Sequence, residues 1–163
     1  MLIKQRLASL IVNCATLALS LQQDNGSMPK GHNGPYYDLD TPVRNTAHWC
    51  ITFLEAWRQT GDKAYRQAAE NALGYLLSSR ARPQDGAFYC RSDSNKDQTN
   101  GIIGQAWVIE ALVEASLALG RSDALDLAKQ VFLLHPYEWI EGGWKKTTLS
   151  GEIIGFDRTF NHQ

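Results

Sequence analysis

The chain repeats a pattern of landmarks at an interval of about 58 residues. Each copy begins with a Gly two positions before a large apolar residue, and a polar loop comes next. Asp, Thr and Asn follow the loop in that order, with Asn at the start of an apolar stretch. The copies run through Asp40, Thr41 and Asn45, through Asp97, Thr99 and Asn100, and through Asp157, Thr159 and Asn161. The threonines are 58 and 60 residues apart. Such self-similarity predicts one supersecondary unit repeated along the chain.

Helical periodicity fills the stretches between these landmarks. Apolar residues three and four positions apart predict helices over 45–59, 63–79, 102–119 and 123–134, and an amphipathic first helix within 1–22. The first stretch also has two basic residues before an apolar run, as secretion signals do, but its helical spacing favours a helix of the folded protein. Residues 102–119 are apolar on nearly every side, which predicts an inner helix followed by an amphipathic outer one.

The loops alternate between short and long. Turns within a helical pair take only a few residues, whereas the connections between pairs cover about 22–44, 80–101 and 135–160. Short turns join antiparallel neighbours, so every long loop should emerge at one end, together with the starts of the inner helices. We therefore expect Asp40, Asp97 and Asp157 to lie near one another.

This arrangement resembles the (α/α) toroid superfamily. Residues 77–88 resemble the loop signature of prenyltransferase and squalene-cyclase repeats. Residues 97–112 look more like the six-hairpin glycosidase and epimerase-like group, which includes toroid proteins of polysaccharide biosynthesis. The resemblance implies an all-α fold, with about five helices forming antiparallel hairpins of a partial toroid in a single domain over 1–163.

The length of the chain sets a second expectation. A ring of six helical pairs would need roughly 350 residues, and the chain has 163. We expect either a fragment of a full toroid or a short protein whose open flanks are covered by another subunit, because an apolar inner helix cannot face water. A homo-oligomer is therefore predicted.

The carboxylates at the loop end are the candidate catalytic residues. Glycoside hydrolysis needs one carboxyl group as acid and another as base or nucleophile, and Asp40, Asp97 and Asp157 could supply the pair. The alternative role is structural, because Asp and Thr directly before a helix are preferred N-caps. Thr41 followed by Pro42 fits an N-cap with proline in the first helical position.

Four further residues are candidate substrate ligands. Arg44 could bind a uronate carboxylate, and His48 lies one turn further along the same helix. Tyr37 and Trp107 could stack on sugar rings. The competing interpretation is that His48 and the aromatic residues only pack inside the fold.

Composition narrows the partners and cofactors. With 16 basic and 17 acidic residues, the chain has a net charge of −1, which argues against nucleic acid and acidic membranes. Its three cysteines form no CxxC pair, and His48 and Cys50 point to different sides of a helix, so no metal or other cofactor is expected. Terpenoid cyclisation is disfavoured because Thr41 stands where an Asp-rich motif needs Asp. A cytoplasmic location is the default expectation.

These observations lead to two hypotheses of different classes. The first is a carbohydrate-active protein that binds an oligosaccharide at the loop end, and hydrolyses it with paired carboxylates if it is an enzyme. The second is a non-catalytic interaction or structural module that assembles with itself. Carboxylates turned back onto helix N–H groups, with no open cleft at that end, would contradict an enzyme. A cleft with two carboxylates roughly 5–10 Å apart would support one.

Overall fold

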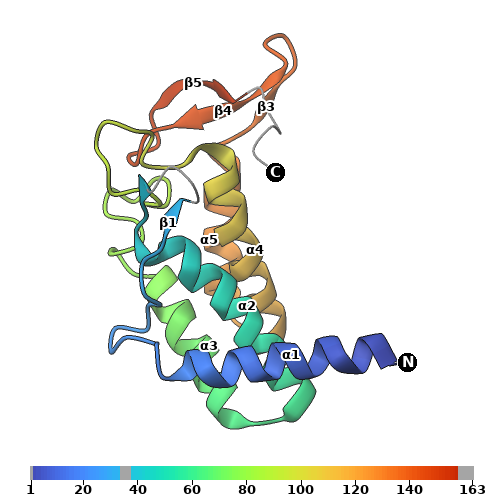
Figure 1. The fold of residues 1–163 in the computed structure, drawn as a ribbon. Coiled ribbons are helices and arrows are strands. Elements are labelled where there is room, and N and C mark those ends of the chain that lie inside the picture. Colours follow the sequence, from blue (N-terminus) through green and yellow to red (C-terminus); the bar gives the residue numbers. More distant parts are fainter. Residues whose placement is uncertain (1, 34–37, 158–163) are drawn as a thin grey trace.

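The structure, a computed structural model, describes residues 2–33 and 38–157. Five helices and two small sheets make up this part of the chain (Figure 1). The helices are α1 (Leu2–Leu19), α2 (Pro42–Thr60), α3 (Lys63–Leu76), α4 (Gly101–Leu119) and α5 (Ser122–Leu133). The strands are β1 (His32–Asn33), β2 (Asp38–Leu39), β3 (Tyr137–Glu138), β4 (Gly143–Thr147) and β5 (Ile153–Asp157).

Helices α2 and α3, and again α4 and α5, form antiparallel hairpins, as the repeat predicts. The two first helices run in parallel. Near their starts Arg44 lies over the ring of Trp107, and near their ends Arg58 Nη2 donates to Glu114 Oε2 at 2.7 Å. The starts of α2 and α4 therefore share one end of the bundle (Figure 1).

Local capping explains where α2 and α3 begin and end. Thr41 is the N-cap of α2 and accepts a hydrogen bond from Val43 N at 3.3 Å, with Pro42 in the first turn. Gly61 ends the helix with a left-handed φ of 71°, and Asp62 then caps α3 by accepting from Ala64 N at 2.9 Å. Each such cap stabilises its helix by about 1 kcal/mol, and the Thr41 cap was expected from the sequence.

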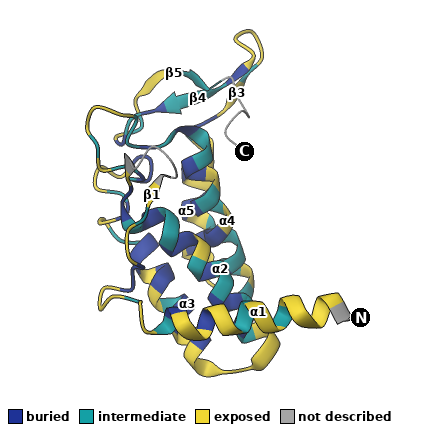
Figure 2. Cartoon of the chain, viewed as in Figure 1, coloured by how far each residue is buried: buried dark blue, intermediate teal, exposed yellow. Residues whose placement is uncertain are grey.

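The hydrophobic core lies between the two hairpins (Figure 2). Its large side chains are fully buried and come from all four hairpin helices, among them Phe53, Leu73, Leu112 and Val131. Burial of each such side chain stabilises the fold by roughly 1.5–3 kcal/mol. The core therefore holds the starts of α2 and α4 in a fixed relation.

The expected all-α class is wrong. Strands β3, β4 and β5 form a three-stranded antiparallel sheet in that order, within the segment expected to be a loop over 135–160. The segment contains four glycines, and its strands are only two to five residues long, so its period-two pattern is too short to stand out. The chain is mainly helical, with this sheet above the start of α4 (Figure 1).

The long loops meet at the end where α2 and α4 start. Thr41 N donates to Cys90 O at 3.0 Å, which joins the first loop to the second. Gly86 N donates to Leu149 O at 3.1 Å, which joins the second to the third. This part of the loop prediction is confirmed, and strand β4 of the sheet packs against α4 of the second hairpin.

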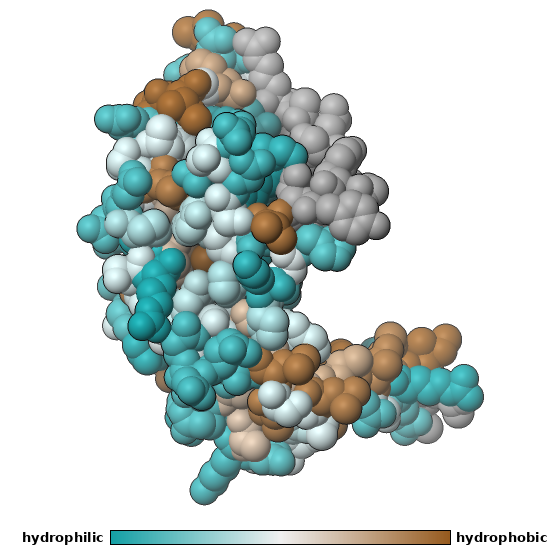
Figure 3. All heavy atoms as spheres, turned by 60° about the vertical axis from the view of Figure 1, so that its left-hand side comes forward, coloured by the Kyte–Doolittle hydropathy of each residue, from teal (hydrophilic) through white to brown (hydrophobic). Residues whose placement is uncertain are grey.

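Two helices carry apolar surface outside the core. The first half of α1 projects from the rest of the chain (Figure 3), with Ile3 74% and Leu10 57% exposed. Within the described residues, α4 is long and apolar enough to cross a membrane by length and composition. In this fold α4 instead packs against its neighbours through residues such as Val108 and Leu112, while Leu117 is 75% exposed. The predicted homo-oligomer, which would cover such surface, stays a prediction.

Candidate functional site

Two of the predicted carboxylates lie at the start of α4. The residue at the N-cap position, Asn100, has a left-handed φ of 59° and its side chain caps nothing. Asp97 Oδ2 instead accepts from Gly101 N at 2.8 Å, and Asp157 Oδ2 accepts from Ile102 N at 3.3 Å. Both carboxylates therefore act as caps, and both interact favourably with the positive end of the helix dipole.

Gly101 allows these two carboxylates to converge. A Cβ atom at this position would lie 2.6 Å from Asp157 Oδ2 and 3.8 Å from Asp97 Oδ2. The residue also has a φ of 57°, which L side chains rarely adopt. A side chain here would push into the space that the two carboxylates share, so the geometry of the cluster depends on glycine.

Lys146 on β4 balances part of the negative charge. Its Nζ lies 2.9 Å from Asp97 Oδ2. Burial alone would raise the pKa of Asp97, but Lys146, the Thr99 side chain and the Gly101 N–H outweigh burial and lower it. Asp97 is therefore held as a carboxylate, a form that can accept a proton but has none to give.

His135 lies close to the same cluster. It is 2% exposed, and its Nδ1 lies 2.8 Å from Lys145 O. Its Nε2 has no hydrogen-bond partner among the described residues. Burial lowers the pKa of His135, while the Lys145 carbonyl and the Asp97 and Asp157 carboxylates partly offset the effect. Because burial outweighs these interactions, the imidazole is held mainly neutral.

Lys146 and His135 were not among the predicted site residues. No local motif marks them, because each reaches the cluster through the unexpected sheet. An available signal was the sequence Gly143-Trp-Lys-Lys-Thr147, whose β-branched and aromatic residues are compatible with a strand. Recognising that strand would have placed Trp144 and Lys146 on one face.

Asp40 belongs to the start of α2. It is 4% exposed and forms an ion pair with Arg44, one turn further along. Its backbone forms a bridge with Arg91 of the second loop. The pKa of the Cys90 thiol is raised to about 12. Burial is the main cause, and the negative charges of Asp40 and Asp97 add to it. Asp40 and Asp97 therefore both lie within electrostatic reach of the buried Cys90.

Three predicted substrate ligands form one cluster between α2 and α4. The Arg44 guanidinium carbon lies 5.6 Å from the centroid of the Trp107 ring, and the ring centroids of His48 and Trp107 are 5.5 Å apart. Burial and then Arg44 lower the pKa of His48, whereas Glu110 raises it. We call Arg44, His48 and Trp107 the α2/α4 cluster. The fourth predicted ligand, Tyr37, lies outside the described residues.

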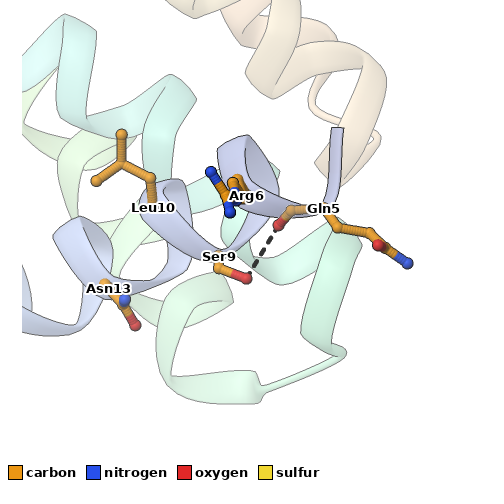
Figure 4. A pocket seen from close by; sticks show the side chains of 5 residues that line it. All are labelled: Gln5, Arg6, Ser9, Leu10 and Asn13. Atoms are coloured by element: carbon orange, nitrogen blue, oxygen red, sulfur yellow. Dashed lines mark hydrogen bonds between the residues drawn. The ribbon is translucent and has the colours of Figure 1, made fainter. Parts of the chain in front are cut away.

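A pocket elsewhere in the fold is separate from these groups. It has a volume of about 360 Å³ and lies along one face of α1 (Figure 4). Its lining residues are Gln5, Arg6, Ser9, Leu10 and Asn13. Ser9 Oγ already donates to Gln5 O at 3.0 Å, and the lining contains no carboxylate. None of the predicted site residues contributes to this pocket.

Comparison with known proteins finds one informative similarity. The chain is 49% identical over 157 residues to archaeal glycosylation protein Q of Haloferax volcanii. The aligned region covers 96% of this chain but 42% of that protein, so the chain spans less than half of its relative's length. No family model matches the chain, and no solved structure matches it. The toroid resemblance therefore stays a prediction, while the curated relative connects the sequence to a protein named for glycosylation.

Proposed function

We propose that the chain takes part in glycosylation by binding an oligosaccharide at the α2/α4 cluster. Two lines of support meet here. The curated relative, 49% identical, is named a glycosylation protein. The α2/α4 cluster places a cation 5.6 Å and an imidazole 5.5 Å from the centroid of one indole ring. This second observation carries the proposal, because these are the groups that bind an acidic sugar.

Each member of the cluster has a separate task. The Arg44 guanidinium presents planar N–H donors that match a carboxylate, and the ligand's acidic group would replace or join Asp40 as its partner. Trp107 offers an aromatic surface for the C–H groups of a sugar ring. His48, whose pKa is lowered, is mainly neutral and has both a donor and an acceptor for hydroxyl groups. A hexuronate residue within the oligosaccharide fits these three groups best.

Hydrolysis is the second candidate function, and the convergence of Asp97 and Asp157 near Gly101 favours it. Because the pKa of Asp97 is lowered, this residue suits the role of base or nucleophile and not that of acid. Asp40 is paired with Arg44, which leaves Asp157 as the candidate for the acid. Against hydrolysis stands the engagement of Asp97 and Asp157 as caps of α4, so binding is the better supported function.

The binding proposal is tested by titrating the chain with a hexuronate-containing oligosaccharide and with the same oligosaccharide after reduction of its carboxyl groups. We expect NMR shifts at the α2/α4 cluster and stronger binding of the acidic form. Arg44→Ala should weaken binding of the acidic form roughly tenfold or more, as loss of a charged hydrogen-bonded contact does.

Arg66 provides a matched control. Its guanidinium lies 5.1 Å over the Trp57 ring, and its Nε lies 2.9 Å from Glu70 Oε1, so it makes the same two kinds of contact away from the loop end. Arg66→Ala should bind as the wild type does. Equal losses in the two variants, or no binding of either oligosaccharide by the wild type, would contradict the proposal.

A separate assay addresses hydrolysis. Release of reducing ends from the oligosaccharide that binds should be lost in Asp97→Asn if the carboxylate takes part in chemistry, while affinity is retained. Binding without any release by the wild type would leave the chain as a binding protein.

A further inference from the structure

Three aromatic side chains form a row on the sheet. The Tyr137 ring lies edge-on to Trp139, with centroids 4.8 Å apart, and edge-on to Trp144, with centroids 5.2 Å apart; both interplanar angles are 74°. Trp139 is 84% exposed and Tyr137 is 36% exposed. We call Trp139, Tyr137 and Trp144 the aromatic row. Edge-to-face contacts of this kind hold the rings in place before any ligand arrives.

The pairing of the strands extends this row to the carboxylate cluster. Tyr137 of β3 is directly opposite Trp144 of β4, and Trp144 is directly opposite Asp157 of β5. Directly opposite residues of antiparallel strands have their side chains on the same face. Since Asp157 reaches the start of α4 through Ile102 N, one face of the sheet leads from the exposed Trp139 to the loop end.

We propose that the aromatic row binds successive sugar rings of the same oligosaccharide, beyond the unit held at the α2/α4 cluster. This inference rests on the proposed function and adds an extended subsite to it. Trp139 offers an exposed indole for the apolar face of a sugar ring. Lys146 lies two positions from Trp144, on the same face of β4, and its pairing with Asp97 marks the inner end of the row.

The chemistry around the row favours sugar over a membrane. Glu138 and Glu141 flank the exposed Trp139 and Ile140 at the turn between β3 and β4. Two acidic residues at the tip oppose insertion among lipids, especially anionic ones, and the chain has no basic surplus to offset them. A sugar ring has apolar faces and a polar edge. Aromatic rings bordered by charged side chains match both parts of such a ligand.

The test compares oligosaccharides of one composition and increasing length. For Trp139→Ala we expect affinity for the longer ligands to fall roughly tenfold, as the loss of one ring contact implies, with no change for the shortest ligand that binds. Trp139→Phe should recover most of the loss. Ile153→Ala is the control, because Ile153 is a 56% exposed apolar residue of the same sheet without an aromatic ring.

The outcomes separate this inference from the proposed function. If Trp139→Ala binds long ligands like the wild type while Arg44→Ala does not, the aromatic row is not a subsite and the proposed function stands. If the wild type binds no sugar of any length, the proposed function itself falls. The sugar assignment is also overturned if Trp139 is needed instead for sedimentation with phosphatidylcholine and phosphatidylglycerol vesicles, or for dimer formation in analytical ultracentrifugation.

Discussion

Lys146 Nζ lies 2.9 Å from Asp97 Oδ2, and this contact joins the sheet to the loop before α4. Because the pKa of Asp97 is lowered in the folded state, its contribution to stability is present above the ordinary Asp pKa of about 4. That contribution is lost as the pH falls through the lowered value. Lys146→Met should raise the pKa of Asp97 and reduce stability at neutral pH by about 0.5–1 kcal/mol.

Carboxyl-carbon NMR titration and urea unfolding at several pH values measure both effects. Lys145→Met is the control, since the neighbouring residue removes an equal charge from the same strand. An Asp97 pKa that moves equally in the two variants would show that the effect is one of overall charge and not of the contact.

Gly101→Ala should destabilise the chain by about 2–3 kcal/mol. Placing a side chain at a residue with left-handed φ costs about 1–2 kcal/mol of stability. Displacing Asp157 costs about 1 kcal/mol more, because its Oδ2 caps α4 and would lie 2.6 Å from the new Cβ. Gly120→Ala is the matched variant: its φ is 70°, and a Cβ there meets nothing within 4 Å. In urea unfolding, equal losses for the two variants would argue against crowding of the carboxylates.

The thiols should differ in reactivity. Cys50 and Cys90 are buried, and burial raises the pKa of each to about 12, so almost no thiolate forms at neutral pH. Cys14 is exposed. In the native chain a disulfide reagent should therefore modify Cys14 alone at an appreciable rate, and all three cysteines after denaturation. Cys14→Ser should abolish the fast phase; a second fast thiol would indicate that the core opens readily.

The pKa of His48 should respond in opposite directions to its two charged neighbours. Removal of the guanidinium in Arg44→Ala should raise this pKa, and removal of the carboxylate in Glu110→Gln should lower it, with burial lowering it in every variant. Proton NMR titration of the imidazole measures the shifts, with Arg66→Ala as the unaffected reference. A His48 pKa that ignores both substitutions would mean that the α2/α4 cluster is not assembled in solution.

Local patterns were sufficient to predict the helices. The expected ranges agree with α2 to α5 within a few residues, because Thr41 with Pro42 and Gly61 with Asp62 carry their boundary signals in adjacent positions. The parallel course of α2 and α4 also followed from loop lengths alone. Such features depend on neighbours in the sequence, which a single chain displays directly.

The sheet and the carboxylate cluster depend on contacts between distant residues. The role of Asp97 as a cap was one of two interpretations that the sequence left open, and its hydrogen bond to Gly101 N shows that capping occurs. Asp157 caps α4 by accepting a hydrogen bond from Ile102 N, 55 positions away in the sequence. No sequence pattern near either residue predicts this contact. A strand as short as β3 is recognisable only from its pairing with β4 in the structure.

The cap supplied by Asp157 also orders events in folding. The first turn of α4 receives a hydrogen bond from strand β5, which is placed only when the sheet has docked. Pairing of strands takes about 1–10 μs, against about 0.1–1 μs for a helix. The hairpin core can therefore form while the start of α4 still frays. The amide proton of Ile102 should then gain protection from exchange later than those in the middle of the same helix, so the carboxylate cluster is completed last.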